Sequence, residues 1–145
     1  MTHEDAGHYA DKHPKDRKVD PNIAEALKAR TKDGMISCAA AFKVVNDLNV
    51  APAEVGFTID SLETKIIHCQ LGIFGYAEGK KPLKYMDTVQ VELREAIENA
   101  LVDGKIPCRS SWEIADRFGL TKLNVASACE TLKIKVSPCQ LGAFK

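Results

Sequence analysis

The chain has 145 residues, 45% of them hydrophobic and 28% charged, and its 20 basic residues balance 20 acidic ones. Length and composition predict one globular domain or two small ones. A net charge of zero argues against a protein that binds phosphate over its whole surface. No apolar run is long enough to cross a membrane, and the polar start does not resemble a signal peptide. Five cysteines without an export signal favour reduced thiols and a cytoplasmic location.

The first half of the chain is predicted to hold a polar arm, three helices and a strand. Asp20 followed by Pro21 is typical of a helix start, and Asp33-Gly34 of a helix end. The expected elements are a flexible arm over residues 1–20, helices over about 21–32, 37–48 and 52–62, a strand over 65–69, and a short return strand over 73–76 that would complete a hairpin.

The second half repeats this order after a polar linker. Gly119 and Thr121 mark a turn and the start of a helix. The expected elements are a linker over 77–90, helices over about 91–101, 110–118 and 121–132, and a strand over 134–139.

One structural unit is written twice in this sequence. Cys69-Gln70-Leu71-Gly72 recurs seventy residues later as Cys139-Gln140-Leu141-Gly142. Without a gap, 14 of 54 positions are identical between residues 22–75 and 92–145. We therefore predict a first repeat over 21–76 and a second over 91–145. Their charges differ, because residues 33–76 carry a net charge of −3 and residues 103–145 a net charge of +3.

The second repeat resembles a helix-turn-helix. Ala115, Gly119 and Val125 have the spacing of that family, in which a small residue allows close helix packing and glycine allows positive φ. Val45, Asn49 and Val55 stand at these positions in the first repeat. With a strand after the third helix, each repeat looks like a minimal winged helix. The expected fold class is mainly α with short β-strands, as two tandem repeats related by a pseudo-twofold.

The chain also resembles a family of small uncharacterised proteins that carry the Cys-Gln-Leu-Gly motif twice, and this second resemblance implies no activity. The helix-turn-helix resemblance implies a DNA-binding transcriptional regulator that uses its two units in tandem, with the third helix of each repeat in a major groove of double-stranded DNA. Asparagine suits adenine, and lysine and arginine suit phosphates. The candidate nucleic-acid-binding residues of the second repeat are Thr121, Lys122, Asn124, Ser127, Arg109, Arg117, Lys133 and Lys135.

An alternative is a non-catalytic interaction module, or an accessory subunit of a larger metalloenzyme or redox complex. The third helix of the first repeat is acidic and apolar, and Glu54, Phe57 and Asp60 would offer a surface to a protein partner. No motif typical of a catalytic site occurs in the chain, so we do not expect an enzyme.

The cysteines leave two interpretations open. Cys129 replaces Ile59 of the first repeat and is predicted to be a core residue. The other four, Cys38, Cys69, Cys108 and Cys139, match in pairs between the repeats. Because short CxxC spacing is absent, buried packing is the favoured interpretation and no cofactor is expected. Zinc or an iron–sulfur cluster held by these four thiols is the alternative.

Overall fold

The computed structural model describes residues 7–144, which form two compact units. Unit 1 contains the chain up to Cys69 together with Gln140–Phe144, and unit 2 contains Gln70–Cys139. The unit boundaries therefore fall inside the two Cys-Gln-Leu-Gly motifs, whereas we expected them at the 77–90 linker. Residues 1–6 of the predicted arm and residue 145 of the second repeat lie outside the described residues.

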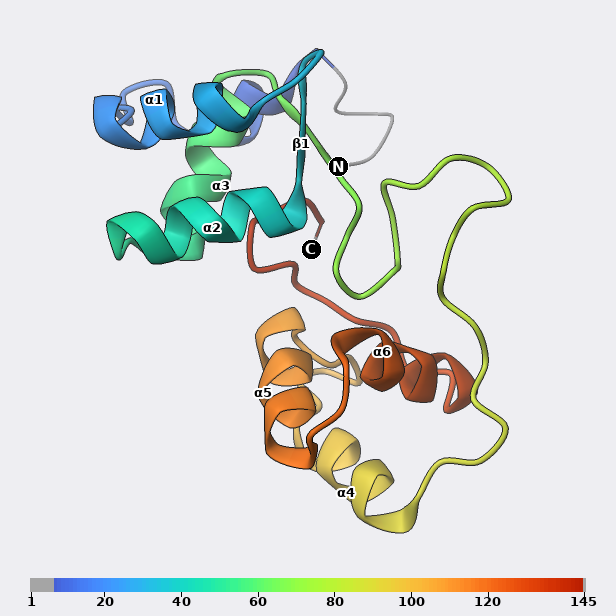
Figure 1. Ribbon diagram of the computed structural model, residues 1–145. Helices are drawn as coiled ribbons and strands as arrows, with labels where there is room; N and C mark the ends of the chain where they lie inside the picture. Colours follow the sequence, from blue (N-terminus) through green and yellow to red (C-terminus); the bar gives the residue numbers. More distant parts are fainter. Residues whose placement is uncertain (1–6, 145) are drawn as a thin grey trace. The chain divides into compact units, whose positions relative to one another are not determined.

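The described residues are mainly helical and include a small two-stranded parallel sheet (Figure 1), which confirms the expected class of helices with short strands. The elements of unit 1 are η2 (Tyr9–Lys12), α1 (Pro21–Arg30), β1 (Met35–Ser37), α2 (Cys38–Leu48), α3 (Pro52–Ser61) and β2 (Lys65–Ile67). The elements of unit 2 are α4 (Val91–Asn99), α5 (Cys108–Phe118) and α6 (Lys122–Thr131).

The strands pair differently from the expected hairpin. β1 runs parallel to β2 with Ile36 opposite Ile66, and both isoleucines are only 1% exposed. Unit 2 keeps one parallel bridge of this kind, between Ile106 and Val136. Residues 73–76 form bends and turns instead of a return strand. Parallel pairing buries both isoleucines, whereas the chain after Cys69 turns away through glycines in the left-handed region.

The two repeats share the backbone conformation of their turns. Asp33 and Asp103 both have a φ of +53°, in the turns that precede α2 and α5. Asn49 and Gly119, which end α2 and α5, have φ of +52° and +65°. The duplication of the sequence is therefore also a duplication of local structure.

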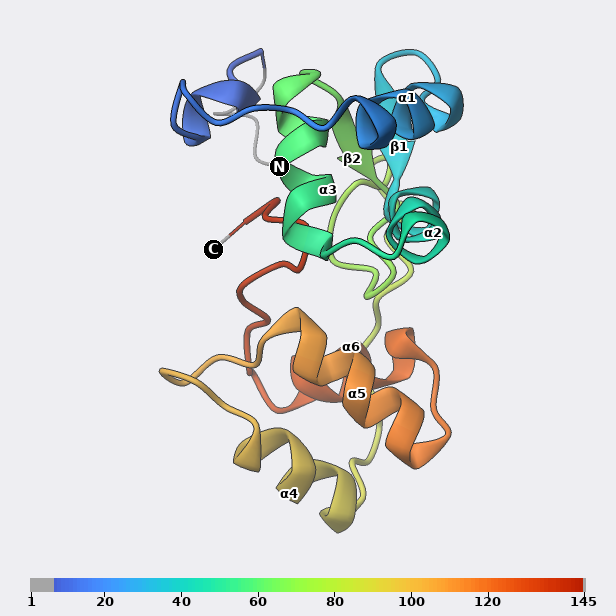
Figure 2. The same ribbon diagram turned by 90° about the vertical axis from the view of Figure 1, so that its left-hand side faces the viewer.

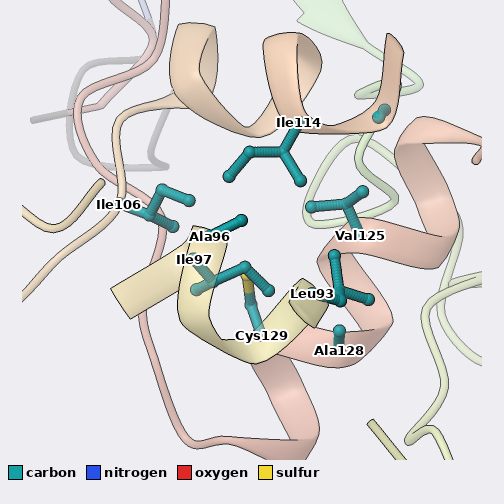
Figure 3. Close-up of a cluster of buried hydrophobic side chains, with 9 residues drawn as sticks. Leu93, Ala96, Ile97, Ile106, Ile114, Val125, Ala128 and Cys129 are labelled. Atoms are coloured by element: carbon teal, nitrogen blue, oxygen red, sulfur yellow. The ribbon is translucent and has the colours of Figure 1, made fainter. Parts of the chain in front are cut away.

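A single apolar core holds the three helices of unit 2 together. The side chains of Leu93 and Ile97 on α4 point towards Val125 and Cys129 on α6 (Figure 3). Burying a leucine or isoleucine side chain contributes about 1.5–3 kcal/mol, so this core is the main stabilising feature of the unit. The cluster comprises Leu93, Ala96, Ile97, Ile106, Ile114, Ala115, Val125, Ala128 and Cys129.

From residue 7 onwards, the predicted flexible arm lies along α3 (Figure 2). Tyr9 is 4% exposed, and its backbone N–H donates a hydrogen bond of 2.7 Å to the Glu63 carboxylate. His13 Nε2 lies 2.7 Å from Asp60 Oδ2, and the guanidinium of Arg17 stacks 3.9 Å from the ring centroid of Phe57. Polar composition suggested a solvated arm, but these specific contacts attach the described part of it to unit 1.

The end of the chain completes unit 1, where Figures 1 and 2 draw it in red beside α3. Leu141 is 2% exposed, and its carbonyl oxygen lies so close to Gly56 that a Cβ there would be 1.9 Å away. Conversely, the motif at Gln70–Gly72 belongs to unit 2, where a Cβ on Gly72 would lie 2.7 Å from the side chain of Leu123 on α6. Each unit thus contains the motif that follows the strand of the other repeat.

Candidate nucleic-acid interface

A sharp left-handed turn joins α5 to α6 in unit 2. Gly119 ends α5 with φ of +65° and ψ of 28°, and its N–H donates to the carbonyls of Ala115 and Asp116. Ala115 is 1% exposed and Val125 is fully buried, so both fill the angle between the helices. These three residue types at this spacing hold the first part of α6 at a fixed angle to α5.

The start of α6 presents polar side chains to solvent. Thr121 and Asn124 are exposed, and the Thr121 hydroxyl caps the helix by accepting the Asn124 backbone N–H at 3.0 Å. The Lys122 ammonium lies 4.6 Å from the ring centroid of Trp112, a cation–π contact that orients the side chain. Ser127 is half-buried, one turn further along the helix. Thr121 and Asn124 are therefore the candidate residues at the start of α6 that the structure leaves accessible, and Asn124 is the one whose amide suits adenine.

The basic residues surround this helix pair without forming one cluster. Arg109 and Arg117 are both exposed and lie eight residues apart on α5, about 12 Å along its axis. Arg109 forms an ion pair of 3.1 Å with Glu113, while the guanidinium of Arg117 lies 5.2 Å from the ring centroid of Phe118. Lys133 and Lys135 are exposed in the segment that follows α6. The structure thus places these four cations at separate points around α5 and α6.

Two of the three residues predicted to face a protein partner in the first repeat, Phe57 and Asp60, are buried by the chain itself, whereas Glu54 stays partly exposed. Phe57 is 3% exposed and Asp60 is 1% exposed. Asp60 Oδ2 is 3.2 Å from the Lys12 ammonium and 2.7 Å from His13, and Glu54 forms an ion pair with Arg17. No sequence pattern indicates this cover, since the contacting residues lie about forty to fifty positions apart and follow no helical or strand period.

Four of the five cysteines follow the paired backbone segments of the units, which are β1 and β2 in unit 1 and the bridged Ile106 and Val136 in unit 2. Cys38 and Cys108 are the first residues of α2 and α5 and are buried, as is Cys69 after β2, whereas Cys139 is half-buried. Cys129 is 1% exposed within the core of unit 2, which confirms the prediction for it. Its burial, reinforced by the negative charge of Glu130, raises the pKa of the thiol to about 11.

Within residues 7–144, no three or more His, Cys, Asp or Glu side chains gather as a metal site would require. Zinc or an iron–sulfur cluster on the four repeated cysteines stays the untested alternative to buried packing, and elemental analysis of protein prepared without oxygen would test it. None of the helices formed by these residues has the length and apolar character needed to span a membrane.

A groove of about 280 Å³ between α4 and α5 was not predicted. Of the residues around it, the sequence had singled out only Arg117. A comparison of the two repeats could have indicated the groove, because Asn99 and Ser110 of the second repeat replace alanines of the first. The groove is lined by Ala96, Asn99, Ala100, Ser110, Glu113, Ile114 and Arg117.

No protein-family model, curated protein sequence or solved structure matches this chain.

Proposed function

We propose that unit 2 is a helix-turn-helix module that binds double-stranded DNA, and that the protein is a transcriptional regulator. The observation that carries this proposal is the start of α6. Its buried side is apolar, its exposed side carries Thr121 and Asn124, and the left-handed Gly119 fixes its angle to α5. Helix-turn-helix proteins place this part of their second helix in the major groove.

The candidate residues divide into two roles. Asn124 would read a base, because its amide can both donate to and accept from adenine. Lys122 would contact a phosphate. Its contact with Trp112 already restricts the lysine side chain, so binding would cost less conformational entropy. Arg109, Arg117, Lys133 and Lys135 would contact phosphates at the edges of the interface, which positions the protein without reading sequence.

Only one such module per chain is available in this proposal. The corresponding helix of unit 1, α3, carries Glu54 in its first turn, and its buried residues include Gly56, Phe57 and Asp60. A single chain would therefore contact one half-site. The neutral net charge agrees with a small basic interface rather than a wholly basic surface. The alternative of an interaction module would have to use a different surface, since Phe57 and Asp60 of the one proposed for it are buried.

The test is fluorescence anisotropy of the full chain with a pool of random DNA duplexes, followed by selection of the tightest sequences. We expect affinity that falls steeply with salt, because each phosphate contact releases counterions and contributes about −0.9 to the log–log slope. Replacing both Lys122 and Asn124 by alanine should weaken the selected complex at least about tenfold, since removing one base contact costs about 1–3 kcal/mol.

Arg94→Ala is the matched control. It removes a cation from α4 of the same unit, where Arg94 forms an exposed ion pair of 2.9 Å with Glu98 and is not one of the proposed interface residues. We expect this variant to bind as the unchanged chain does. Binding that ignores salt, or that survives the Lys122 and Asn124 double substitution, would show that α6 is not the interface.

A further inference from the structure

The groove between α4 and α5 combines an apolar floor with polar side chains at its edge. Ala96 and Ile114 are buried beneath it, whereas Asn99, Glu113 and Arg117 are exposed at its sides. Its volume of about 280 Å³ is slightly below that of pockets for drug-sized molecules, about 300–1,000 Å³. The groove therefore has room for a ligand of a few heavy atoms.

The first repeat has an ion pair between the helices that correspond to α4 and α5. Arg30, the last residue of α1, reaches Asp47 on α2, and the guanidinium and carboxylate are 3.1 Å apart. Seventy residues later, Ala100 stands in place of Arg30 and Arg117 in place of Asp47. The second repeat thus lacks the long side chain that spans the helices and carries a guanidinium on the opposite side.

Two further differences fall on the same groove. Asn99 replaces Ala29, and Ser110 replaces Ala40. Both changes introduce a hydrogen-bonding side chain into the lining that also contains Arg117, which makes no ion pair among the described residues. At four of the seven lining positions, therefore, the second repeat loses the ion pair of the first repeat and gains polar side chains that no ion pair occupies.

We propose that this groove binds a small carboxylate with a short apolar body. A guanidinium pairs with a carboxylate through two parallel hydrogen bonds, so Arg117 would hold the carboxylate group. The Asn99 amide and Ser110 hydroxyl would contact its second oxygen or a neighbouring polar group, and the apolar part would lie over Ala100 and Ile114. Glu113 at the edge repels a dianion, which favours a monoanionic carboxylate over inorganic phosphate.

This inference goes beyond DNA binding and does not depend on it, because ligand binding is measured on the chain without DNA. The probe is isobutyrate, titrated into the full ¹⁵N-labelled chain and followed by NMR. We expect saturable shifts at the Asn99 and Ser110 amides and at the Arg117 side chain, with neutral isobutyramide causing none. Arg117→Ala should weaken binding about tenfold or more, since a hydrogen bond to a charged group contributes about 1.5–3 kcal/mol.

Two further variants separate the site from a general effect of charge. Arg30→Ala removes a guanidinium at the end of α1 in unit 1 and should leave isobutyrate binding unchanged. Ala100→Arg with Arg117→Asp rebuilds the ion pair of the first repeat, which should fill the groove and abolish binding while the spectrum of the core stays that of a folded chain. Equal shifts with isobutyramide, tighter binding of inorganic phosphate, or binding that survives Arg117→Ala would each overturn the proposal.

Discussion

Replacing Gly56 by alanine should release the end of the chain from α3. A Cβ at this position would lie 1.9 Å from the carbonyl oxygen of Leu141 and 2.6 Å from its carbonyl carbon. Both atoms belong to the backbone, so no side-chain rotation can relieve the overlap. The release exposes Leu141 and Ala143, which are each 2% exposed in the structure, and breaks the 3.1 Å hydrogen bond from the Lys12 ammonium to the Gly142 carbonyl.

This release removes buried apolar surface and one hydrogen bond, which together stabilise the chain by several kcal/mol. Two opposing effects then reduce the net loss. Burial of a leucine side chain contributes about 1.5–3 kcal/mol and a hydrogen bond about 0.5–1.5 kcal/mol. The released residues regain conformational entropy, and alanine is about 1 kcal/mol better than glycine within a helix. We therefore expect a net decrease of roughly 1–3 kcal/mol in the free energy of unfolding, measured by urea denaturation.

A chain truncated after Cys139 is the comparison that isolates the cause. Without the terminal residues the three atoms nearest to the added Cβ, all from the Leu141 backbone, are absent, so Gly56→Ala should become neutral or stabilising by up to about 1 kcal/mol. Ala126 of α6 already has a Cβ at the matching position, so Ala126→Gly should cost about 1 kcal/mol in either background. The explanation fails if Gly56→Ala costs the same with and without residues 140–145.

Three other substitutions test separate features. His13→Ala should lower the free energy of unfolding by about 1–3 kcal/mol, because the buried Asp60 carboxylate loses a 2.7 Å partner. Urea denaturation measures the loss, and His13→Gln should lose less stability. Gly119→Ala should lower stability by about 1 kcal/mol through its φ of +65° alone, since nothing lies within 4 Å of the added Cβ. Asn49→Gly, at the matching left-handed position, should be neutral or slightly stabilising. Equal changes in thermal stability for the two variants would contradict this explanation. The folded chain holds the Cys129 proton more tightly than the unfolded chain, because the pKa of the thiol rises from 9.0 to about 11. Stability should therefore be constant with respect to this group below pH 9 and fall by roughly 2–3 kcal/mol between pH 9 and 11, a slope absent from Cys129→Ala.

Local signals explain why the helices could be predicted. The Asp20 carboxylate accepts the Asn22 N–H at 2.8 Å, and the Thr121 hydroxyl accepts the Asn124 N–H at 3.0 Å. Both residues therefore cap the helix starts that the sequence predicts. Gly119 adopts the left-handed conformation expected of a residue that ends a helix. These interactions span two to four residues, so a single sequence contains all the information that they need.

The features that were missed depend on residues far apart in the chain. β1 is three residues long and pairs with a strand thirty positions later, so no alternation of polar and apolar residues marks it. His13 and Asp60 are separated by 47 positions. The motif at Gln70–Gly72 and its copy at Gln140–Gly142 are identical, and the sequence therefore cannot distinguish packing on one repeat from packing on the other.

In a chain of one repeat, the arrangement seen here would require a second molecule to supply the leucine and glycine that pack on each unit. Completion of the fold would then depend on protein concentration. Gene duplication followed by fusion replaces that encounter with a tethered one, at the high effective concentration that a covalent connection provides. Neither repeat is therefore expected to fold completely when expressed alone, because the motif that completes its unit belongs to the other repeat.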